Sequence, residues 1–175
     1  KLRMDEQDKT KRKNRKAIAS FLRFMGTLLV IAVLAVLLPL SIPNFIGYQT
    51  YNVISGSMEP TIPIGSLILV KPAEGNDIEV DDIVAFYNNG IVVTHRVTYN
   101  NSFEGTITTK GDANVSEDVR KTKYGEIIGK VEHHYPYLGS LGAYVSTVSG
   151  KLLFFEIICI GALLHIIAGR VYQED

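Results

Sequence analysis

A short turn with two serines, SGSMEP at residues 55–60, is the first stretch of this sequence whose residue types suit a chemical reaction. Gly56 lets the backbone turn sharply and Pro60 fixes the exit, so the hydroxyl of Ser57 is left on the turn. A serine hydroxyl is a weak nucleophile until a base takes its proton, and backbone N–H groups of such a turn can stabilise the resulting oxyanion. Ser57 is therefore a candidate nucleophile, although Ser-Gly-Ser is also common in ordinary loops.

A base for this serine is offered by His95, which lies in the middle of a predicted strand, VVTHRV. Alternation places Val93, His95 and Val97 on one face and Thr94 and Arg96 on the other. An imidazole on a partly buried face suits a general base, because histidine changes its charge near neutral pH. The alternative is a structural histidine of the core.

A third group should orient the imidazole, and two carboxylates follow in one loop, KGDANVSED. Asp112 lies in a Gly-Asp turn, and Asp118 comes six residues later. Loop carboxylates are often solvated or act as caps, but either of these can accept a hydrogen bond from the second imidazole nitrogen. The residues themselves leave the choice between Asp112 and Asp118 open.

The segment that carries these residues has the pattern of a β domain. Apolar and β-branched runs recur between turn formers, and the NNG at residues 88–90 predicts a hairpin, because its positive φ angles favour Asn and Gly. No sustained helical period occurs outside the two apolar runs described next. The predicted strands are SLILV (66–70), DIVAFY (82–87), IVVTHRVTY (91–99), GTITTK (105–110) and GEIIGKVEHHY (125–135).

Two long apolar runs flank this domain. Residues 24–40 form 17 residues without a charge, which at ~1.5 Å per residue approaches the ~30 Å hydrocarbon thickness of a bilayer. We predict an uncleaved anchor, because the apolar core of a signal peptide is usually only ~7–15 residues long and ends at a small-residue site. Residues 152–168 form a second run of 17, but it contains Glu156 and His165, which are costly inside a bilayer unless paired.

The charge distribution predicts how the chain crosses the membrane. Residues 1–16 hold 8 Lys/Arg against 3 Asp/Glu, and the positive-inside rule then places the N-terminus in the cytoplasm. A nucleic-acid or lipid-binding patch is the other interpretation of such a block. The predicted organisation is a basic cytoplasmic N-terminus (1–16), an anchor (17–46), an extracytoplasmic β domain (47–143), a second span (144–168) and a cytoplasmic tail (169–175).

Three sequence boxes in this order, SGSMEPT, THRV and KGDANVSED, on a β domain behind an anchor resemble type I signal peptidase, peptidase family S26. The resemblance covers roughly residues 48–135. It is to the branch shared by the endoplasmic reticulum complex, archaea and some Gram-positive bacteria, because a histidine stands where the common bacterial branch has lysine. It implies a membrane-bound serine endopeptidase that removes signal peptides. The implied roles are Ser57 as nucleophile, His95 as base, Asp118 as the third member and Asp112 as a supporting residue.

The remaining expectations concern the surroundings of this site. Ser55 and the amide of Ser57 are the expected oxyanion hole, on geometric grounds, and Met58 is expected to dip toward lipid. The partners implied are precursor proteins with signal peptides and the lipid bilayer, with no nucleic acid, and neither a metal nor an organic cofactor is needed. The only cysteine, Cys159, lies in the second apolar run, so the β domain is expected to have no disulfide.

Two alternatives remain at this point. The chain can be a catalytically silent membrane subunit whose β domain recruits secreted proteins, with SGSMEP only a turn and His95 only part of the core. It can also be a self-cleaving repressor-type serine peptidase, which has a related β fold but uses a lysine base and has no membrane anchors. The presence of a serine, a histidine and both acids argues against the first, and the apolar runs and His95 argue against the second.

Overall fold

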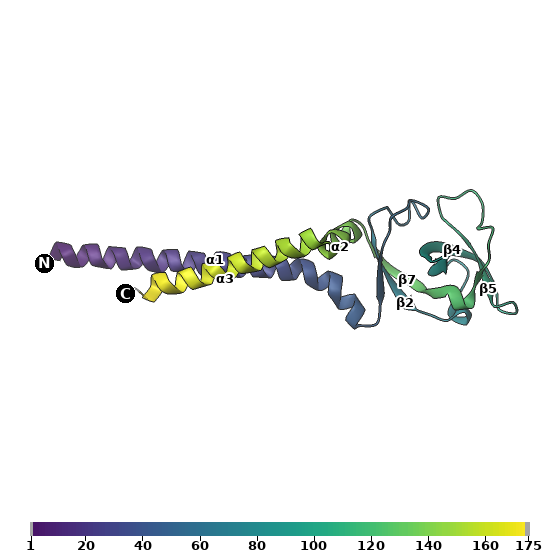
Figure 1. Ribbon diagram of the computed structural model, residues 1–175, viewed down its shortest axis with the longest axis horizontal. Coiled ribbons are helices and arrows are strands. Elements are labelled where there is room, and N and C mark those ends of the chain that lie inside the picture. Colours follow the sequence, from purple (N-terminus) through teal and green to yellow (C-terminus); the bar gives the residue numbers. More distant parts are fainter. Residues whose placement is uncertain (1, 174–175) are drawn as a thin grey trace. The chain divides into compact units, whose positions relative to one another are not determined.

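The computed structural model describes residues 2–173 and divides the chain into two units. One unit contains helix α1 as far as Pro39 together with α3, and the other runs from Leu40 to Ser146. Figure 1 labels the longer elements. In chain order they are α1 (Leu2–Phe45), β1 (Gln49–Asn52), β2 (Leu67–Pro72), η1 (Gly75–Asp77), β3 (Ile83–Asn88), β4 (Ile91–Asn101), β5 (Thr106–Lys110), β6 (Thr122–Lys123), η2 (Tyr124–Glu126), β7 (Ile127–Tyr135), α2 (Leu138–Ser146) and α3 (Val148–Gln173).

The helical unit supplies two segments that are long and apolar enough to cross a membrane. They are Lys9–Phe45, with a mean hydropathy of 2.6, and Val148–Tyr172, with a mean hydropathy of 2.3. Helix α1 also runs through the basic block, because Lys, Arg and Gln are good helix formers. The two apolar runs predicted as spans are therefore helical.

Small and polar side chains bring α1 and α3 together. A Cβ atom on Gly26 would lie 2.8 Å from the carbonyl oxygen of Gly161, so the two backbones approach as closely as glycine allows. Beside this crossing, the hydroxyl of Thr27 lies 3.2 Å from Nε2 of His165. His165, an expensive residue for an apolar helix, thus has a polar partner within the helix pair.

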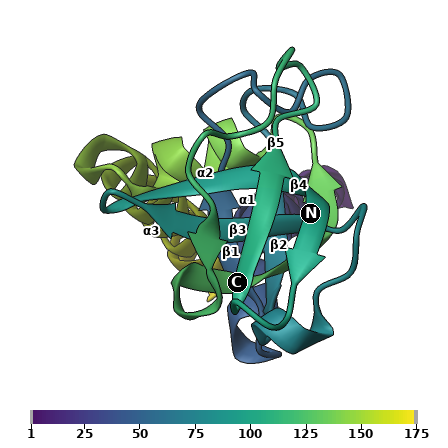
Figure 2. The ribbon, with the colours of Figure 1, turned by 90° about the vertical axis from the view of Figure 1, so that its right-hand side faces the viewer.

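The second unit is built on a seven-stranded antiparallel sheet in the order β1-β2-β7-β3-β4-β5-β6. The predicted mainly β domain between two apolar helices is confirmed, and each of the five predicted runs forms a strand. The NNG hairpin joins β3 to β4 through Asn89 and Gly90, whose φ angles are 50° and 82°. Strands β3, β4 and β5 lie side by side in Figure 2.

Strand β3 is apolar from Ile83 to Phe86 because this part of it is covered on both faces of the sheet. Val84 and Phe86 point into one hydrophobic cluster, and Ala85 between them points into the other. The first cluster consists of Met58, Ile62, Ile68, Val70, Ala85 and Ile128. The second consists of Ile78, Val84, Phe86, Val97 and Ile107.

The structure adds strands β1 and β6 and helix α2 to the elements that were predicted. Helix α2 has only nine residues, including Gly139 and Gly142, so its local signal is weak. It forms because Gly139 packs directly against the backbone of Ser66. A Cβ atom on Gly139 would lie 2.3 Å from the carbonyl oxygen of Ser66. The amide of Ser140 also donates to the carbonyl of Gly65, at 3.1 Å.

Gly129 in the central strand β7 gives a test of this packing. A Cβ atom there would lie 2.0 Å from the carbonyl oxygen of Lys71 in β2, and backbone atoms have little room to move away. We expect Gly129→Ala to lower the free energy of unfolding of the β domain by about 3 kcal/mol. Gly125→Ala is the matched control, because nothing lies within 4 Å of that position, and thermal unfolding of the full chain in detergent compares the two. Equal unfolding temperatures would contradict the close β2-β7 approach.

Candidate active site

Two buried apolar side chains anchor the loop that carries Ser57 in the core of the β domain. Met58 is 2% exposed and Ile62 is fully buried, and both belong to the first hydrophobic cluster. The expectation that Met58 dips toward lipid is therefore wrong, because its side chain turns into the core of the β domain and anchors the loop there. On the other side, the amide of Ala113 donates to the carbonyl of Ser57, at 2.9 Å.

His95 lies on the predicted face of β4, only 8% exposed. Val97 and Val93 pack into the second cluster, and the ring of Phe86 from the same cluster meets the imidazole edge to face, with centroids 6.2 Å apart. Nδ1 of His95 lies 2.6 Å from a carboxylate oxygen of Asp118. Because an ionised carboxylate only accepts hydrogen bonds, Nδ1 is the donor in this contact, and a neutral imidazole in this tautomer has its lone pair on Nε2.

Asp118 is fixed in place by Thr109 of strand β5. The buried hydroxyl of Thr109 donates to the same carboxylate oxygen at 2.6 Å, and the amide of Asp118 donates to the carbonyl of Thr109 at 2.8 Å. Of the two acids in the loop, Asp118 is thus the one that contacts His95. Its position matches that of a carboxylate that orients an imidazole and stabilises its protonated form.

Asp112 has a different partner, Arg96 on the opposite face of β4. Nε and one terminal nitrogen of Arg96 donate to the two carboxylate oxygens at 2.9 and 2.7 Å, and the hydroxyl of Thr61 donates to Asp112 at 2.6 Å. The hydrogen bonds from Arg96 hold the pKa of the Asp112 carboxyl below its ordinary value, and those to Asp112 raise the pKa of Arg96. Asp112 therefore ties the segment after Ser57, through Thr61, to the strand that carries His95.

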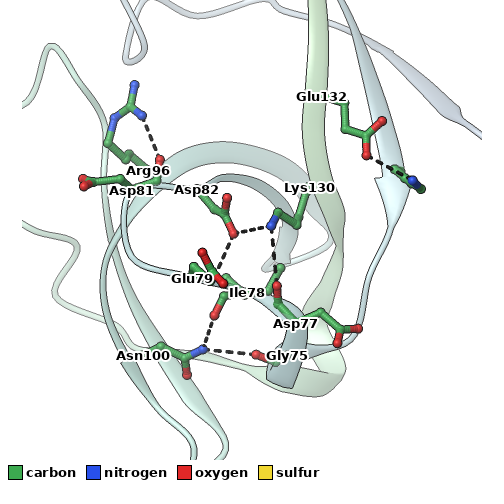
Figure 3. A network of polar contacts seen from close by, with 11 residues as sticks. Gly75, Asp77, Ile78, Glu79, Asp81, Asp82, Arg96, Asn100, Lys130 and Glu132 are labelled. Carbon is green, nitrogen blue, oxygen red and sulfur yellow. Dashed lines mark hydrogen bonds and ion pairs between the residues drawn. The ribbon is translucent and has the colours of Figure 1, made fainter.

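A second polar network holds the loop that Arg96 also contacts. Figure 3 shows Arg96 donating to the carbonyl of Asp81. This hydrogen bond is 2.9 Å long, and the φ angle of Asp81 is 75°. In the same view Lys130 of β7 forms an ion pair with Asp82 at 2.7 Å, which raises the pKa of the lysine, and Asp82 accepts from the amide of Glu79. The side of Arg96 away from Asp112 is thus fixed by a loop that is itself tied to β7.

Strand register brings Ser57 and His95 to one place. Arg96 of β4 is paired with Lys110 of β5, so the antiparallel register leads from His95 to Gly111 just beyond the end of β5. A Cβ atom on Gly111 would lie 2.6 Å from the carbonyl oxygen of Ser57, so only glycine fits between the Ser57 loop and this end of the β4-β5 pair. Within residues 2–173 no hydrogen bond joins the Ser57 hydroxyl to His95. Catalytic bonds often tighten only when substrate binds.

A cleft of about 470 Å³ is lined by Ser57 and by mostly apolar residues. It is lined by residues 51–55, Ser57, Met58, Ile62, Ile68 and residues 91–94. Ser55 lies on its wall, two residues before Ser57. The cleft can hold a segment of extended peptide, since its walls are mostly apolar and also carry hydroxyl groups.

Both walls of the cleft present unpaired strand edges. The amide of Val53 donates to the carbonyl of Ser66, and the carbonyl of Val53 accepts from the amide of Gly65. Because main-chain groups alternate in direction along an extended strand, those of Asn52 and Ile54 point away from residues 65–66. On the opposite wall, residues 91–94 of β4 pair with β3 on one edge only, because pairing with β5 begins at Arg96. An extended peptide can therefore add as a strand to either edge.

Comparison with known proteins gives one informative similarity. The chain is 37% identical over 81 residues to signal peptidase I W of Bacillus subtilis, a match that covers 43% of this chain and 42% of that relative. No family model matches the chain. The similarity, together with the antiparallel sheet and two long apolar helices, supports a relationship to signal peptidase I, a class of peptidases.

Three residues of this site had no role in the sequence-based prediction. Thr109 was read only as part of a strand, Thr61 follows the serine turn directly, and Arg96 is the neighbour of His95. The signal for Arg96 was its charge, since an arginine on a half-buried strand face needs a carboxylate partner. No local signal marks Thr109, because its role depends on the return of the loop to β5.

The Asp112-Arg96 pair predicts an effect of pH on stability. The folded-state pKa of Asp112 is lowered, so its stabilisation is present above the unfolded value of about 3.9 and is lost as pH falls through the folded value. We expect Asp112→Asn to cost about 1.5–3 kcal/mol at neutral pH and to weaken the fall in stability below about pH 4. Unfolding measured at both pH values tests this.

The control for this prediction is Glu104→Gln. Its carboxylate pairs with Lys121 at 2.9 Å, which lowers its pKa in the same direction, but the pair is exposed. Exposed pairs contribute little, so this variant should unfold like the wild type at neutral pH. If Asp112→Asn is as stable as Glu104→Gln, the bidentate pair does not hold the loop.

Proposed function

We propose that this chain is a membrane-bound serine endopeptidase that removes N-terminal signal peptides from exported proteins by acyl transfer. The observation that carries the proposal is the convergence at Gly111 of the Ser57 loop and of His95, itself paired with Asp118, beside a cleft with two open strand edges. The similarity to signal peptidase I W supports the substrate class.

The reaction follows from the position of each group. Nε2 of His95 takes the proton of the Ser57 hydroxyl, and the serine oxygen attacks the carbonyl carbon of the scissile peptide bond. The Ser57 amide and the Ser55 hydroxyl donate to the oxyanion of the tetrahedral intermediate. The protonated His95, stabilised by Asp118, then gives its proton to the leaving amine. An acyl-enzyme remains, which water releases with His95 again as base.

The cleft supports an extended substrate. A peptide strand laid between residues 52–54 and 91–94 places alternate side chains toward the apolar floor formed by Met58, Ile62 and Ile68. The main chain then supplies affinity, and the floor selects side chains by size. The preference for small residues next to the cleavage point is carried over from the resemblance to the family.

The arrangement in the membrane is also a proposal. Residues 17–46 span the bilayer, and so does the predicted second span 144–168 from Val148, where α3 begins. Residues 1–16 and 169–175 lie in the cytoplasm, and residues 47–143 form the catalytic domain outside. Ser57 follows Leu40 by 17 residues, so the nucleophile is near the point where the anchor leaves the bilayer, as cleavage of a membrane-inserted precursor requires. His95 in place of lysine supports the branch shared with the endoplasmic reticulum complex.

The experiment is cleavage of a purified precursor by the full chain in lipid vesicles, with the new N-terminus determined. We expect one cut at the signal-peptide boundary, and none in a matched precursor whose small boundary residues are replaced by bulky ones. A wild-type chain that is inert on several precursors but still captures them would overturn the peptidase proposal in favour of a silent recruiting subunit. A cut elsewhere in the precursor would overturn the substrate class.

A further inference from the structure

Helix α2 presents an exposed apolar face at one end of the β domain. Leu141 and Tyr144 are three residues apart and so lie on the same side of the helix, and Tyr137 directly precedes its first residue. Tyr137, Leu141 and Tyr144 are 83%, 36% and 48% exposed. Tyr137 caps the helix, since its carbonyl accepts from the amide of Leu141 at 3.2 Å. Two tyrosines around a leucine are typical of residues that lie at a membrane surface.

The opposite face of α2 is docked on the segment that leads into the active site. Gly139 packs against the side chain of Asn52 and the carbonyl of Ser66, and Ser140 donates to Gly65. Asn52 lies on the wall of the cleft, and the chain between Asn52 and Gly65 carries the nucleophile Ser57. Helix α2 is thus rigidly attached to both ends of the nucleophile segment.

The neighbours of α2 along the chain indicate that lipid covers its exposed face. A Cβ atom on Gly142 would lie 3.5 Å from the side chain of Leu40, the last residue of the charge-free run in α1. At its other end α2 is separated from α3 by a single residue, Thr147. Beside Leu40 the chain also leaves Phe45 88% exposed and Ile46 67% exposed. The turn of α1 that begins at Leu40 therefore lies beside α2, and α3 follows α2 directly along the chain.

We propose that α2 is an interfacial helix that lies in the headgroup region with Tyr137, Leu141 and Tyr144 toward lipid, and that it sets the height of Ser57 above the bilayer. This rests on the proposed membrane anchorage of α1 and α3. An interfacial helix buries its apolar face roughly 5–10 Å into the boundary between headgroups and acyl chains. Because α2 is docked on residues 52 and 65–66, that depth fixes the distance from lipid to the cleft.

The chain has no tryptophan, so a single introduced indole reports its own depth. We expect Tyr144→Trp and, separately, Tyr137→Trp in full-length protein in vesicles to be quenched about two-fold more strongly by bromine near the carbonyl end of the acyl chain than near its methyl end. Phe103→Trp is the control for an indole in solvent, because Phe103 is 99% exposed in the β4-β5 turn. Bromine at either depth should leave the emission of this tryptophan unchanged. Phe155→Trp in α3 is the control for insertion.

These variants separate the inference from its premise. If Phe155→Trp is not quenched at all, the chain does not span the bilayer and both proposals fall. If Phe155→Trp is quenched but Tyr144→Trp and Tyr137→Trp behave like Phe103→Trp, the spans stand and the interfacial helix is wrong.

A second arm tests whether α2 positions the nucleophile. We expect the combined change of Tyr137, Leu141 and Tyr144 to serine to leave cleavage of a short soluble peptide in detergent unchanged and to slow cleavage of a membrane-inserted precursor in vesicles by about ten-fold. The control changes three exposed apolar residues outside α2, Val80, Tyr99 and Phe103, to serine. Equal precursor cleavage by both triple variants would overturn the positioning role, whatever the quenching shows.

Discussion

Replacing Ser57 with alanine is expected to lower the rate of precursor cleavage about 10⁴-fold or more, with a much smaller change in substrate binding. Ser57 is held by the Met58 anchor and by the contact with Ala113, next to Gly111 at the end of β5 that faces His95. The change removes one oxygen atom and leaves the loop packing intact. Binding should persist because the strand edges of the cleft do not involve the hydroxyl.

His95→Ala should lower the rate of precursor cleavage by a similar factor. The double variant, Ser57→Ala with His95→Ala, should be no slower than either single variant, because nucleophile and base act as one unit. His95→Lys should also be inactive, since an ammonium group cannot reproduce the fixed Nδ1 contact with Asp118. The matched controls are Ser102→Ala and His134→Ala, both exposed and outside the cleft.

Single-turnover cleavage with determination of the new N-terminus measures these effects. A Ser57→Ala variant that keeps more than about a tenth of the wild-type rate would exclude Ser57 as nucleophile. A double variant that is much slower than either single variant would show that the two residues act independently, which the acyl-transfer mechanism does not allow.

Substituting Asp118 with asparagine should lower the rate of the chemical step by about 10³–10⁴-fold. The asparagine oxygen can still accept from Thr109, but the neutral amide no longer holds the proton on Nδ1 or stabilises a protonated imidazole. KM should change little, because Asp118 does not line the cleft. The pH profile should change as well, since the group that balances the imidazolium charge is lost.

Asp112→Asn is the matched comparison, because it makes the same chemical change in the same loop. Asp112 contacts Arg96 and Thr61 but not His95, so we expect its variant to lose stability and to keep most of its rate once folded. Stopped-flow rates beside unfolding curves for both variants separate the two roles. If Asp112→Asn has the larger kinetic effect at equal stability, the assignment of Asp118 as the orienting acid is wrong.

Local patterns were sufficient for most of the fold. Alternation and turn formers predicted the five main strands, and the positive φ angles that NNG favours predicted the β3-β4 hairpin. Strand alternation also placed His95 with Val93 and Val97. These features depend on neighbouring residues along one strand, where the period of the side chains is set by the backbone alone.

Local patterns failed where partners come from distant segments. Met58 follows the nucleophile in a turn, and only the packing of β2, β3 and β7 beneath it turns its side chain inward. Helix α2 exists because two backbone carbonyls and a glycine fit together, a contact between residues more than 70 positions apart in the case of Ser140 and Gly65. Short elements of this kind lack the local propensity to form alone.

The sequence by itself determined which residue types are available for chemistry, the strands that carry them and the two apolar helices. Only the tertiary structure decided that Asp118 pairs with His95 while Asp112 pairs with Arg96. The two acids lie six residues apart in one loop, and nothing in their local sequence separates them. The return of the loop to β5 separates them, because Asp118 is held at Thr109 on the side of His95, while Asp112 pairs with Arg96 on the opposite face of β4.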